Sequence, residues 1–158
     1  MKHLPKHLQP RWRYLAVGIE TWPDADFDRG DFQRHCWYAT QNLLGEAASA
    51  DVDLRVLRFE LDGGNGHAVG RVRRGEVERA RAALACLDSV GDDAVGVRVR
   101  GVSGTVRACE EKYIRGGPEP HEERTVVFED EERTAVVRSR RADVATDDGF
   151  AGATTLDI

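Results

Sequence analysis

The order of strand-like and helix-like hydrophobic patterns is the feature that most restricts the fold of this chain. Residues 11–22 alternate larger apolar side chains with smaller or polar ones, which is typical of a strand with one buried face. Residues 28–44 place apolar side chains at helical spacing. Two runs rich in β-branched and large apolar residues, 52–61 and 67–73, flank the flexible turn 62–66. The sequence therefore predicts a strand, a helix and an antiparallel hairpin.

A second helix and a closing strand complete the pattern. The helix has the apolar stripe Val77, Ala80, Leu84 and Leu87, and residues 94–102 form the last strand. Crossover connections are right-handed and each helix has one apolar stripe, so both helices should cover the same face of one sheet. We therefore predict an α+β fold, a ferredoxin-like or RRM-like βαββαβ sandwich whose other sheet face is open.

Short polar residues and glycines mark the predicted helix ends. Asp28 is the expected N-cap of the first helix and Gly45 its C-cap. After the last strand, Ser103 or Thr105 should cap an additional C-terminal helix that runs to about Ile114.

The chain divides by composition into three parts. We expect residues 1–10 to form an N-terminal arm, residues 11–115 to form one folded domain, and residues 116–158 to form an acidic extension. The net charge of −5 belongs to this last part, because residues 115–158 hold 11 acidic and 6 basic residues whereas the rest holds 17 of each. Within the extension we expect a hairpin over 124–140 and disorder from Ala142 onward.

Several functional classes are disfavoured by the sequence. No apolar run reaches the length of a membrane span and no secretory signal opens the chain, so we expect a cytoplasmic protein. Cys36, Cys86 and Cys109 lack metal-ligand or disulfide spacing and are expected to be reduced thiols, with no metal or cofactor bound by the protein. The five histidines are scattered, with no carboxylate or nucleophile at catalytic spacing. The polypeptide alone is therefore not expected to be catalytic.

Arginines are expected to gather on the open sheet face. Of the 23 basic residues, 20 are arginine. On the last strand the valines should face the helices and leave Arg98 and Arg100 on the opposite side, and Arg71 and Arg73 share one side of the preceding hairpin strand. A cluster of four guanidinium groups predicts an anionic partner, because guanidinium binds phosphate in a planar, bidentate manner.

The same arginines are also compatible with two origins that need no anionic partner. They could form ion pairs with acids on neighbouring strands, such as Glu20 or Glu60. A GC-rich genome would also favour arginine over lysine without any selection for binding. The sequence leaves both alternatives open beside the phosphate-binding hypothesis.

The turn before the C-terminal helix is a candidate phosphate contact. Arg107 lies in the first turn of that helix, where a cation opposes the helix dipole. A phosphate at the free N–H groups would satisfy both the dipole and the arginine. The segment 101–107 is therefore the best candidate for a contact with a nucleic-acid backbone.

The order and spacing of several segments resemble the archaeal ribonuclease P protein component 2 family, small protein subunits of RNase P and MRP. The resemblance covers about residues 1–114, and nothing is carried onto the extension that follows. The segments are Leu4-Pro-x-x-Leu8 with Arg13-Tyr14, Val69-Gly-Arg-Val-Arg73 leading into Val77-x-x-x-Arg81-Ala-Ala-Leu84, and Val99-x-Gly-Val-Ser-Gly-Thr-Val-Arg107 ending in Lys112-Tyr113.

The resemblance implies a subunit that binds the RNA of ribonuclease P, assists it in removing 5′ leaders from precursor tRNA, and pairs with protein component 3 and other RNase P proteins. Catalysis would belong to the RNA and its magnesium ions. The expected partner-protein contacts are Trp37 and Tyr38. The low lysine content with abundant acids also suggests a salt-loving archaeal source. The residues expected to contact RNA are Arg71, Arg73, Arg98, Arg100, Ser103, Thr105, Arg107 and Lys112.

The expected mode of RNA contact is recognition of backbone and shape, because the strand 67–73 lacks the aromatic residues on which RRM domains stack bases. A competing hypothesis is a small-ligand regulatory module of the same βαββαβ order, which would dimerise edge to edge. Such a module would place its site in the loop 21–26 and would not need the arginines.

Overall fold

The chain forms two compact units, one ending at residue 117 and one beginning at residue 118. A computed structural model describes residues 5–9, 11–116 and 121–158, and each unit is treated by itself. The expected N-terminal arm, residues 1–10, is described only over 5–9, which include the short 3-10 helix η1 (Lys6–Leu8). None of the helices among the described residues is long and apolar enough to span a lipid bilayer.

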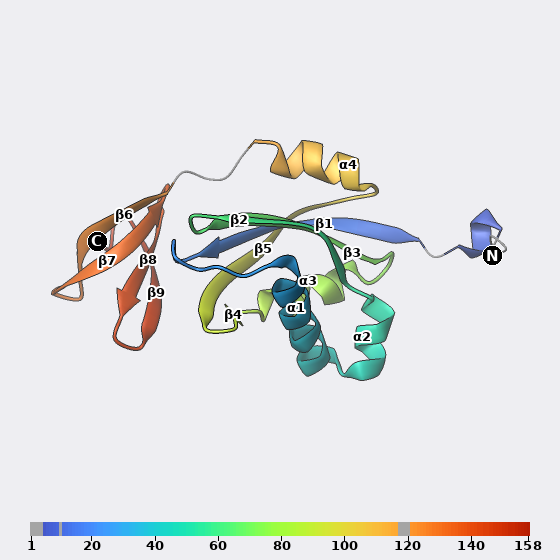
Figure 1. The fold of residues 1–158 in the computed structure, drawn as a ribbon, viewed down its shortest axis with the longest axis horizontal. Coiled ribbons are helices and arrows are strands. Elements are labelled where there is room, and N and C mark those ends of the chain that lie inside the picture. The colour runs from blue at the N-terminus through green and yellow to red at the C-terminus, as the bar shows by residue number, and fades with distance from the viewer. Residues whose placement is uncertain (1–4, 10, 117–120) are drawn as a thin grey trace. The chain divides into compact units, whose positions relative to one another are not determined.

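The N-terminal unit is built on one antiparallel sheet (Figure 1). Its strand order is β2-β3-β1-β5-β4, so β1 lies at the centre between β3 and β5. All the pairings are antiparallel, which confirms the predicted hairpin and the α+β class. The strands are β1 (Trp12–Thr21), β2 (Arg55–Asp62), β3 (Asn65–Arg73), β4 (Ser89–Val90) and β5 (Asp93–Ser103).

Three helices, α1 (Arg29–Leu44), α2 (Glu46–Val52) and α3 (Val77–Ala85), lie on one side of this sheet in Figure 1. The main core lies between them and the sheet. The prediction that both crossover helices cover the same face is confirmed. The short helix α2 was not predicted, and it includes Val52, which the sequence pattern had placed in a strand. Core residues shared by β1 and the helices include Leu15, Val17, Ile19, Phe32, Cys36, Ala80 and Leu84.

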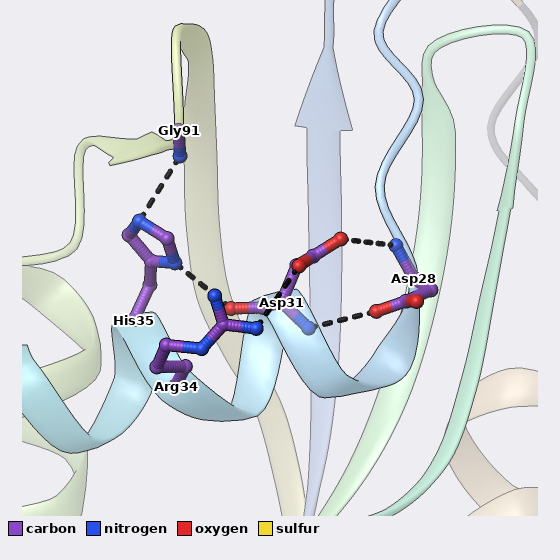
Figure 2. A network of polar contacts seen from close by, with 5 residues as sticks. All are labelled: Asp28, Asp31, Arg34, His35 and Gly91. Atoms are coloured by element: carbon purple, nitrogen blue, oxygen red, sulfur yellow. Dashed lines mark hydrogen bonds and ion pairs between the residues drawn. The ribbon is translucent and has the colours of Figure 1, made fainter.

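The start of α1 is fixed by a capping box. The Asp28 carboxylate accepts a hydrogen bond of 2.8 Å from the Asp31 backbone N–H, and the Asp31 carboxylate accepts one of 3.2 Å from the Asp28 N–H (Figure 2). These bonds satisfy donors that the helix itself leaves free. The hydrogen bond from the Asp31 backbone N–H is the largest cause that lowers the pKa of Asp28. Gly45 ends the helix with φ of 83°, so the predicted caps are confirmed.

Gln33 joins α1 to the beginning of β2. Its side chain is buried, with a relative exposure of 5%. The side-chain amide donates to the Leu54 carbonyl at 3.1 Å, and its oxygen accepts from the Val56 N–H at 2.6 Å. Both backbone groups lie where the strand enters the core, so one side chain satisfies two buried polar groups.

The β2–β3 hairpin depends on glycine at its tip. Gly63 and Gly64 have φ of 59° and 92°, which is the left-handed region required at both central residues of a tight hairpin turn. A Cβ atom at Gly64 would also lie 2.9 Å from the Thr21 carbonyl oxygen. Backbone conformation and close packing against β1 therefore both require glycine at this position.

A C-terminal helix covers part of the sheet face that was expected to be open. It begins as α4 (Val106–Cys109) and continues as a π-helix, η2 (Glu110–Ile114). Figure 1 shows α4 on the side of the sheet opposite α1, α2 and α3. Cys109 packs there with Ala16 and Val69 in a second small core. The predicted additional helix is present, and the sheet face that was expected to be open is open only in part.

The C-terminal unit is a four-stranded antiparallel meander, β6-β7-β8-β9. Val126, Ala135 and Val144 form its small core. The strands β6 and β7 occupy the range of the predicted hairpin, but the expected disorder after residue 142 is wrong, because two further strands pair there. The strands are β6 (Glu122–Phe128), β7 (Glu131–Arg138), β8 (Arg141–Thr146) and β9 (Gly149–Thr154).

Candidate nucleic-acid interface

The candidate interface is the sheet face that carries α4, which we call the α4 face. In β1, Trp12, Tyr14, Ala16 and Gly18 point to it, because Ala16 belongs to the core beneath α4 and strand side chains alternate. Residues directly opposite in an antiparallel pair share a face. The face therefore also carries the partners of these four residues in β3 and β5.

The predicted faces of the arginines agree with the structure. Arg73 lies opposite Trp12, Arg71 opposite Tyr14, and Arg98 opposite Gly18. The valines of β5 pack against the main core on the other side, as expected. A β-bulge in β5 makes Arg100 an extra residue between the partners of Ala16 and Val17. All four arginines predicted from the strands therefore belong to the α4 face.

The arginines form two pairs, one on each strand beside β1. Arg71 and Arg73 lie at the Trp12 end of β1, whereas Arg98 and Arg100 lie at the Gly18 end. Arg73 and Arg98 lie opposite positions six residues apart on β1, ~20 Å along the strand, whereas Arg71 and Arg100 lie beside positions only two to three residues apart, ~8 Å along the strand. The C-terminal helix packs on the sheet between the two ends, over Ala16 and Val69. The face therefore has a basic pair on β3 towards its Trp12 end and a basic pair on β5 towards its Gly18 end.

At the Trp12 end, guanidinium groups stack on an aromatic ring. The guanidinium carbon of Arg71 lies 4.0 Å from the centre of the Trp12 ring, and that of Arg73 lies 5.3 Å from it. Arg73 also makes a long ion pair of 3.5 Å with Asp53. The Nε atom of Arg71 is buried and has no hydrogen-bond partner. Arg55 lies directly opposite Arg71 in the β2–β3 pair and adds a third guanidinium group.

At the Gly18 end, the missing side chain of glycine gives space to two arginines. A Cβ atom at Gly18 would lie 3.2 Å from Cδ of Arg100 and 3.7 Å from Cγ of Arg98. The aliphatic parts of both arginines therefore lie across β1. Nearby on β2 and β3, Glu60 and His67 approach each other at 3.4 Å. Of the two acids considered as arginine partners, Glu60 is thus engaged with a histidine.

The segment 101–115 shows which residue caps the C-terminal helix. The Thr105 hydroxyl accepts a hydrogen bond of 3.1 Å from the Ala108 N–H, so Thr105 is the N-cap. Ser103 instead ends β5, opposite Tyr14. Arg107 pairs with Glu111 at 2.9 Å, although its side chain is 89% exposed. One free N–H is thus already satisfied by Thr105, and Arg107 has an acid as its partner.

A depression lies between η2 and the edge of the sheet. Lys112 places its ammonium 5.4 Å from the Tyr113 ring centre, and Arg58 of β2 pairs with Glu110 at 3.5 Å. The first contact lies within η2, and the second joins η2 to the sheet beneath it. The cavity has a volume of about 410 Å³ and carries charges of both signs; its lining is Glu60, His67, Arg107, Glu110, Glu111, Ile114 and Arg115.

The buried cysteines pack as apolar residues. Burial raises the pKa of the Cys36 thiol to about 12, and burial together with Glu110 raises the pKa of Cys109 to about 11. Both thiols are protonated at neutral pH and are poor nucleophiles. The Cys109 thiol contacts the Tyr14 carbonyl at 3.8 Å beneath α4. All three cysteines are free.

The two residues expected to meet a partner protein lie on α1. Trp37 is 43% exposed and its indole N–H donates to the Leu54 carbonyl at 2.9 Å. Tyr38 is 51% exposed and packs edge-on against His35, with ring centres 5.8 Å apart. Both therefore offer exposed aromatic surface on the helix-covered side, away from the α4 face.

His35 has a structural role beside these aromatics. Its Nε2 accepts a hydrogen bond of 3.0 Å from the Gly91 N–H, and its Nδ1 lies 2.8 Å from the Asp31 carbonyl oxygen (Figure 2). Because a backbone N–H only donates, the proton of the neutral ring must be on Nδ1. The ring thereby connects α1 to the turn before β5.

Sequence reasoning missed Trp12 and Arg55 as members of the interface. Trp12 was placed in the first strand, but its face and its partner Arg73 became visible only with the register of β1 and β3. Arg55 required the β2–β3 register. Within 5–9, 11–116 and 121–158, no three His, Cys, Asp or Glu side chains lie close enough to share a metal ion.

Comparison with known proteins gives a consistent result over the whole chain. The model of the Rpp14/Pop5 family matches residues 13–114. A protein of Haloarcula marismortui named "Ribonuclease P protein component 2" is 65% identical over 160 residues, covering 100% of this chain and 99% of the relative. A protein of Natronomonas pharaonis with the same name is 62% identical over 158 residues, covering 100% and 98%. Both relatives come from halophilic archaea, in line with the source suggested by composition.

A third relative matches a shorter part of this chain. The protein of the same name from Methanosarcina mazei is 33% identical over 115 residues, which cover 73% of this chain and 94% of the relative. The similarity to this protein thus has about the length of the N-terminal unit, whereas the two halophilic relatives also match the C-terminal unit. Because the family model matches residues 13–114 and the relatives are identical to this extent, the chain belongs to the Rpp14/Pop5 family.

Proposed function

We infer that this chain is a protein subunit of ribonuclease P, the ribonucleoprotein endonuclease that removes 5′ leaders from precursor tRNA. The observation that carries this inference is the match, over essentially its full length, to proteins named ribonuclease P protein component 2. The chain is thus part of a hydrolase that processes precursor tRNA. Hydrolysis is the work of the RNA and its magnesium ions, and the protein binds no cofactor of its own.

The finer fold assignment is a ferredoxin-like, RRM-like sandwich. Its support is the topology: the elements β1, α1, β2, β3, α3 and β5 follow one another in the βαββαβ order, and the four long strands are arranged β2-β3-β1-β5. The helices α2, α4 and η2 and the strand β4 are additions to this plan. The same plan serves many functions, so the functional inference rests on the relatives and the site.

The α4 face is the proposed RNA-binding surface. Its two basic ends present guanidinium groups, which form bidentate contacts with phosphate. The ion pairs of Arg73 and Arg107 are exposed, so solvent weakens them and phosphate oxygens can replace their carboxylates. The proposed contacts are Arg71, Arg73, Arg98, Arg100, Ser103, Arg107 and Lys112, with Thr105 acting through the helix start that it caps.

Close contacts must carry most of the RNA affinity if the cytoplasm holds near-molar salt, as halophilic relatives suggest. The Debye length falls to ~3 Å at that salt concentration, so long-range attraction is screened. Direct guanidinium–phosphate contacts are screened much less. A cytoplasmic location is part of the proposal, and three free thiols agree with it.

The helix-covered side is the proposed seat of other RNase P proteins, among them protein component 3. Trp37 and Tyr38 support this, because exposed aromatic residues are enriched in protein interfaces. Precursor tRNA is bound within the assembled complex. The two faces of the N-terminal unit would then serve two kinds of partner, RNA on the α4 face and protein on α1.

The experiment that tests the function is cleavage of precursor tRNA by ribonuclease P RNA reconstituted with its other proteins, with and without this chain. Moderate magnesium keeps the reaction dependent on protein. A fall in rate on omission, restored by adding the chain back, is the expected result. An unchanged rate with the folded chain present would contradict it and would favour the ligand module with its site in the loop 21–26.

A further inference from the structure

The Trp12 end of the α4 face has an arrangement that arginine–phosphate contact alone does not explain. Trp12 lies on the central strand β1, and the Arg71 guanidinium group covers its ring at 4.0 Å. Arg73 approaches the same ring at 5.3 Å. A tryptophan on a central strand is the type of position at which RRM-like sheets stack bases. The strand β3 lacks aromatic residues, but β1 supplies one on the same face.

The charges at this end are poorly balanced by the protein. Arg55 and Arg71 lie directly opposite each other in neighbouring strands, where like charges are unfavourable. Among the residues that the structure describes, neither makes an ion pair with a carboxylate, and Asp53 is the partner of Arg73 alone. The buried Nε of Arg71 also lacks an acceptor. An anion at this position would relieve the repulsion and accept hydrogen bonds from these guanidinium groups.

We propose that the Trp12–Arg71 pair is a stacking site for one unpaired nucleotide of RNA, with the guanidinium groups of Arg55 and Arg73 contacting the phosphates that flank it. Unpaired bases stack both on aromatic rings and on guanidinium planes, so the pair offers one continuous stack. The proposal rests on the proposed function, and it adds base stacking to the expected recognition of backbone and shape.

Activity titration of the reconstituted enzyme tests the proposal. The measured quantity is the concentration of this chain that gives half-maximal cleavage of precursor tRNA. Trp12→Ala should raise this concentration about 5- to 150-fold, from ~1–3 kcal/mol of stacking per base. Trp12→Phe should retain most of the affinity, because it keeps a ring, whereas Trp12→Leu should not.

The matched control is Arg81→Ala. Arg81 is exposed on α3, which packs on the other side of the sheet, so this variant removes a positive charge away from the stack. An equal shift for Arg81→Ala and Trp12→Ala would overturn the proposal, because the loss would then be general. A Trp12→Ala variant that reaches half-maximal cleavage at the wild-type concentration would also overturn the proposal. Cleavage that still requires the chain would leave the proposed function intact.

Cross-linking of the unmodified chain covers the case in which the Trp12 variants do not fold. The assembled enzyme, with RNA that contains 4-thiouridine, is irradiated and the cross-linked peptides are identified by mass spectrometry. A peptide from the start of β1 or from the end of β3 is expected. Cross-links confined to other elements would refute the site, whereas failure of the proposed function would appear separately as cleavage that does not need the chain.

Discussion

Replacing Gly101 with alanine should detach the C-terminal helix from the sheet. A Cβ atom at Gly101 would lie 2.1 Å from Cζ and 2.5 Å from Cε2 of the Tyr113 ring, whereas ordinary contact begins near 3.4 Å. The ring must therefore shift by about 1.3 Å or more, the difference between 3.4 and 2.1 Å. Gly101 does not have positive φ, so alanine adds no backbone strain of its own.

The magnitude follows from the burial of the tyrosine ring. An aromatic side chain buries ~150–250 Å² when it is fully enclosed, and Tyr113 is only partly buried. Returning about half of that area to water at ~25 cal/mol per Å² costs ~2–3 kcal/mol. Overpacking generally costs ~1–3 kcal/mol, because the structure relaxes. We therefore expect Gly101→Ala to lower the free energy of unfolding of the N-terminal unit by about 2 kcal/mol.

Urea unfolding followed by tryptophan fluorescence measures this loss. All three tryptophans, Trp12, Trp22 and Trp37, lie in the N-terminal unit, so the signal reports on that unit. In a double-mutant cycle, Gly101→Ala should cost little in the background of Tyr113→Ala, because the space is then empty. An equal cost in both backgrounds, or no measurable cost in either, would refute the packing of Tyr113 on Gly101.

Three further results are expected. Gln33→Ala should destabilise the N-terminal unit by ~1–3 kcal/mol, because the buried Val56 N–H loses its acceptor while the Leu54 carbonyl keeps only the Trp37 indole as donor. Urea unfolding measures this, and a loss below about 0.5 kcal/mol, on the order of an ordinary surface substitution, would contradict the role of Gln33 in joining α1 to β2. A thiol reagent should modify the exposed Cys86 in the native chain and the two buried cysteines only after unfolding, as mass spectrometry would show. Rapid labelling of a second thiol in the native chain would contradict the burial of these two cysteines. Hydrogen bonding to Arg133 lowers the pKa of Asp147 below 3.8. The pair therefore stabilises the C-terminal unit at pH values above the pKa of Asp147 in the unfolded chain, and this stabilisation is lost as the pH falls through the pKa of Asp147 in the folded chain. Asp147→Asn should make the stability of the C-terminal unit less sensitive to acid, as circular dichroism would show.

The N-terminal unit was largely predictable because its signals are local. Asp28 and Gly45 mark the ends of α1 by side-chain chemistry and backbone freedom, and the two glycines at 63–64 specify the hairpin. The alternation in β5 correctly separated valines from arginines. The short helix α2 was missed because its alanine-rich sequence has no stripe of large apolar residues.

The remaining features depend on contacts between distant segments. The packing of Tyr113 on Gly101 requires the sheet to exist before the helix can cover it, and no local pattern of residues 106–114 states which surface they meet. In the C-terminal unit, β8 and β9 contain mostly alanine, glycine and threonine, so their pairing, rather than their hydrophobicity, defines them as strands. Local composition therefore favoured disorder.

The sequence indicated on which face of the sheet the site residues lie, but not how they are grouped on that face. Alternation indicates on which side of a strand an arginine lies, and this was sufficient for Arg71 and Arg98. The distance between them depends on strand register and on the helix that packs between the two ends. The stack of Arg71 on Trp12 likewise needed the β1–β3 register. The expected placement on one face is therefore correct, whereas the division into two pairs was not predicted.

The central claim, that this chain is a subunit of ribonuclease P, is tested most directly by purifying the tagged full-length chain from its own cells and sequencing the RNA that accompanies it. We expect strong enrichment of ribonuclease P RNA, together with cleavage of precursor tRNA at the 5′ end by the purified material. Recovery of the folded chain without that RNA and without cleavage would contradict a role in ribonuclease P.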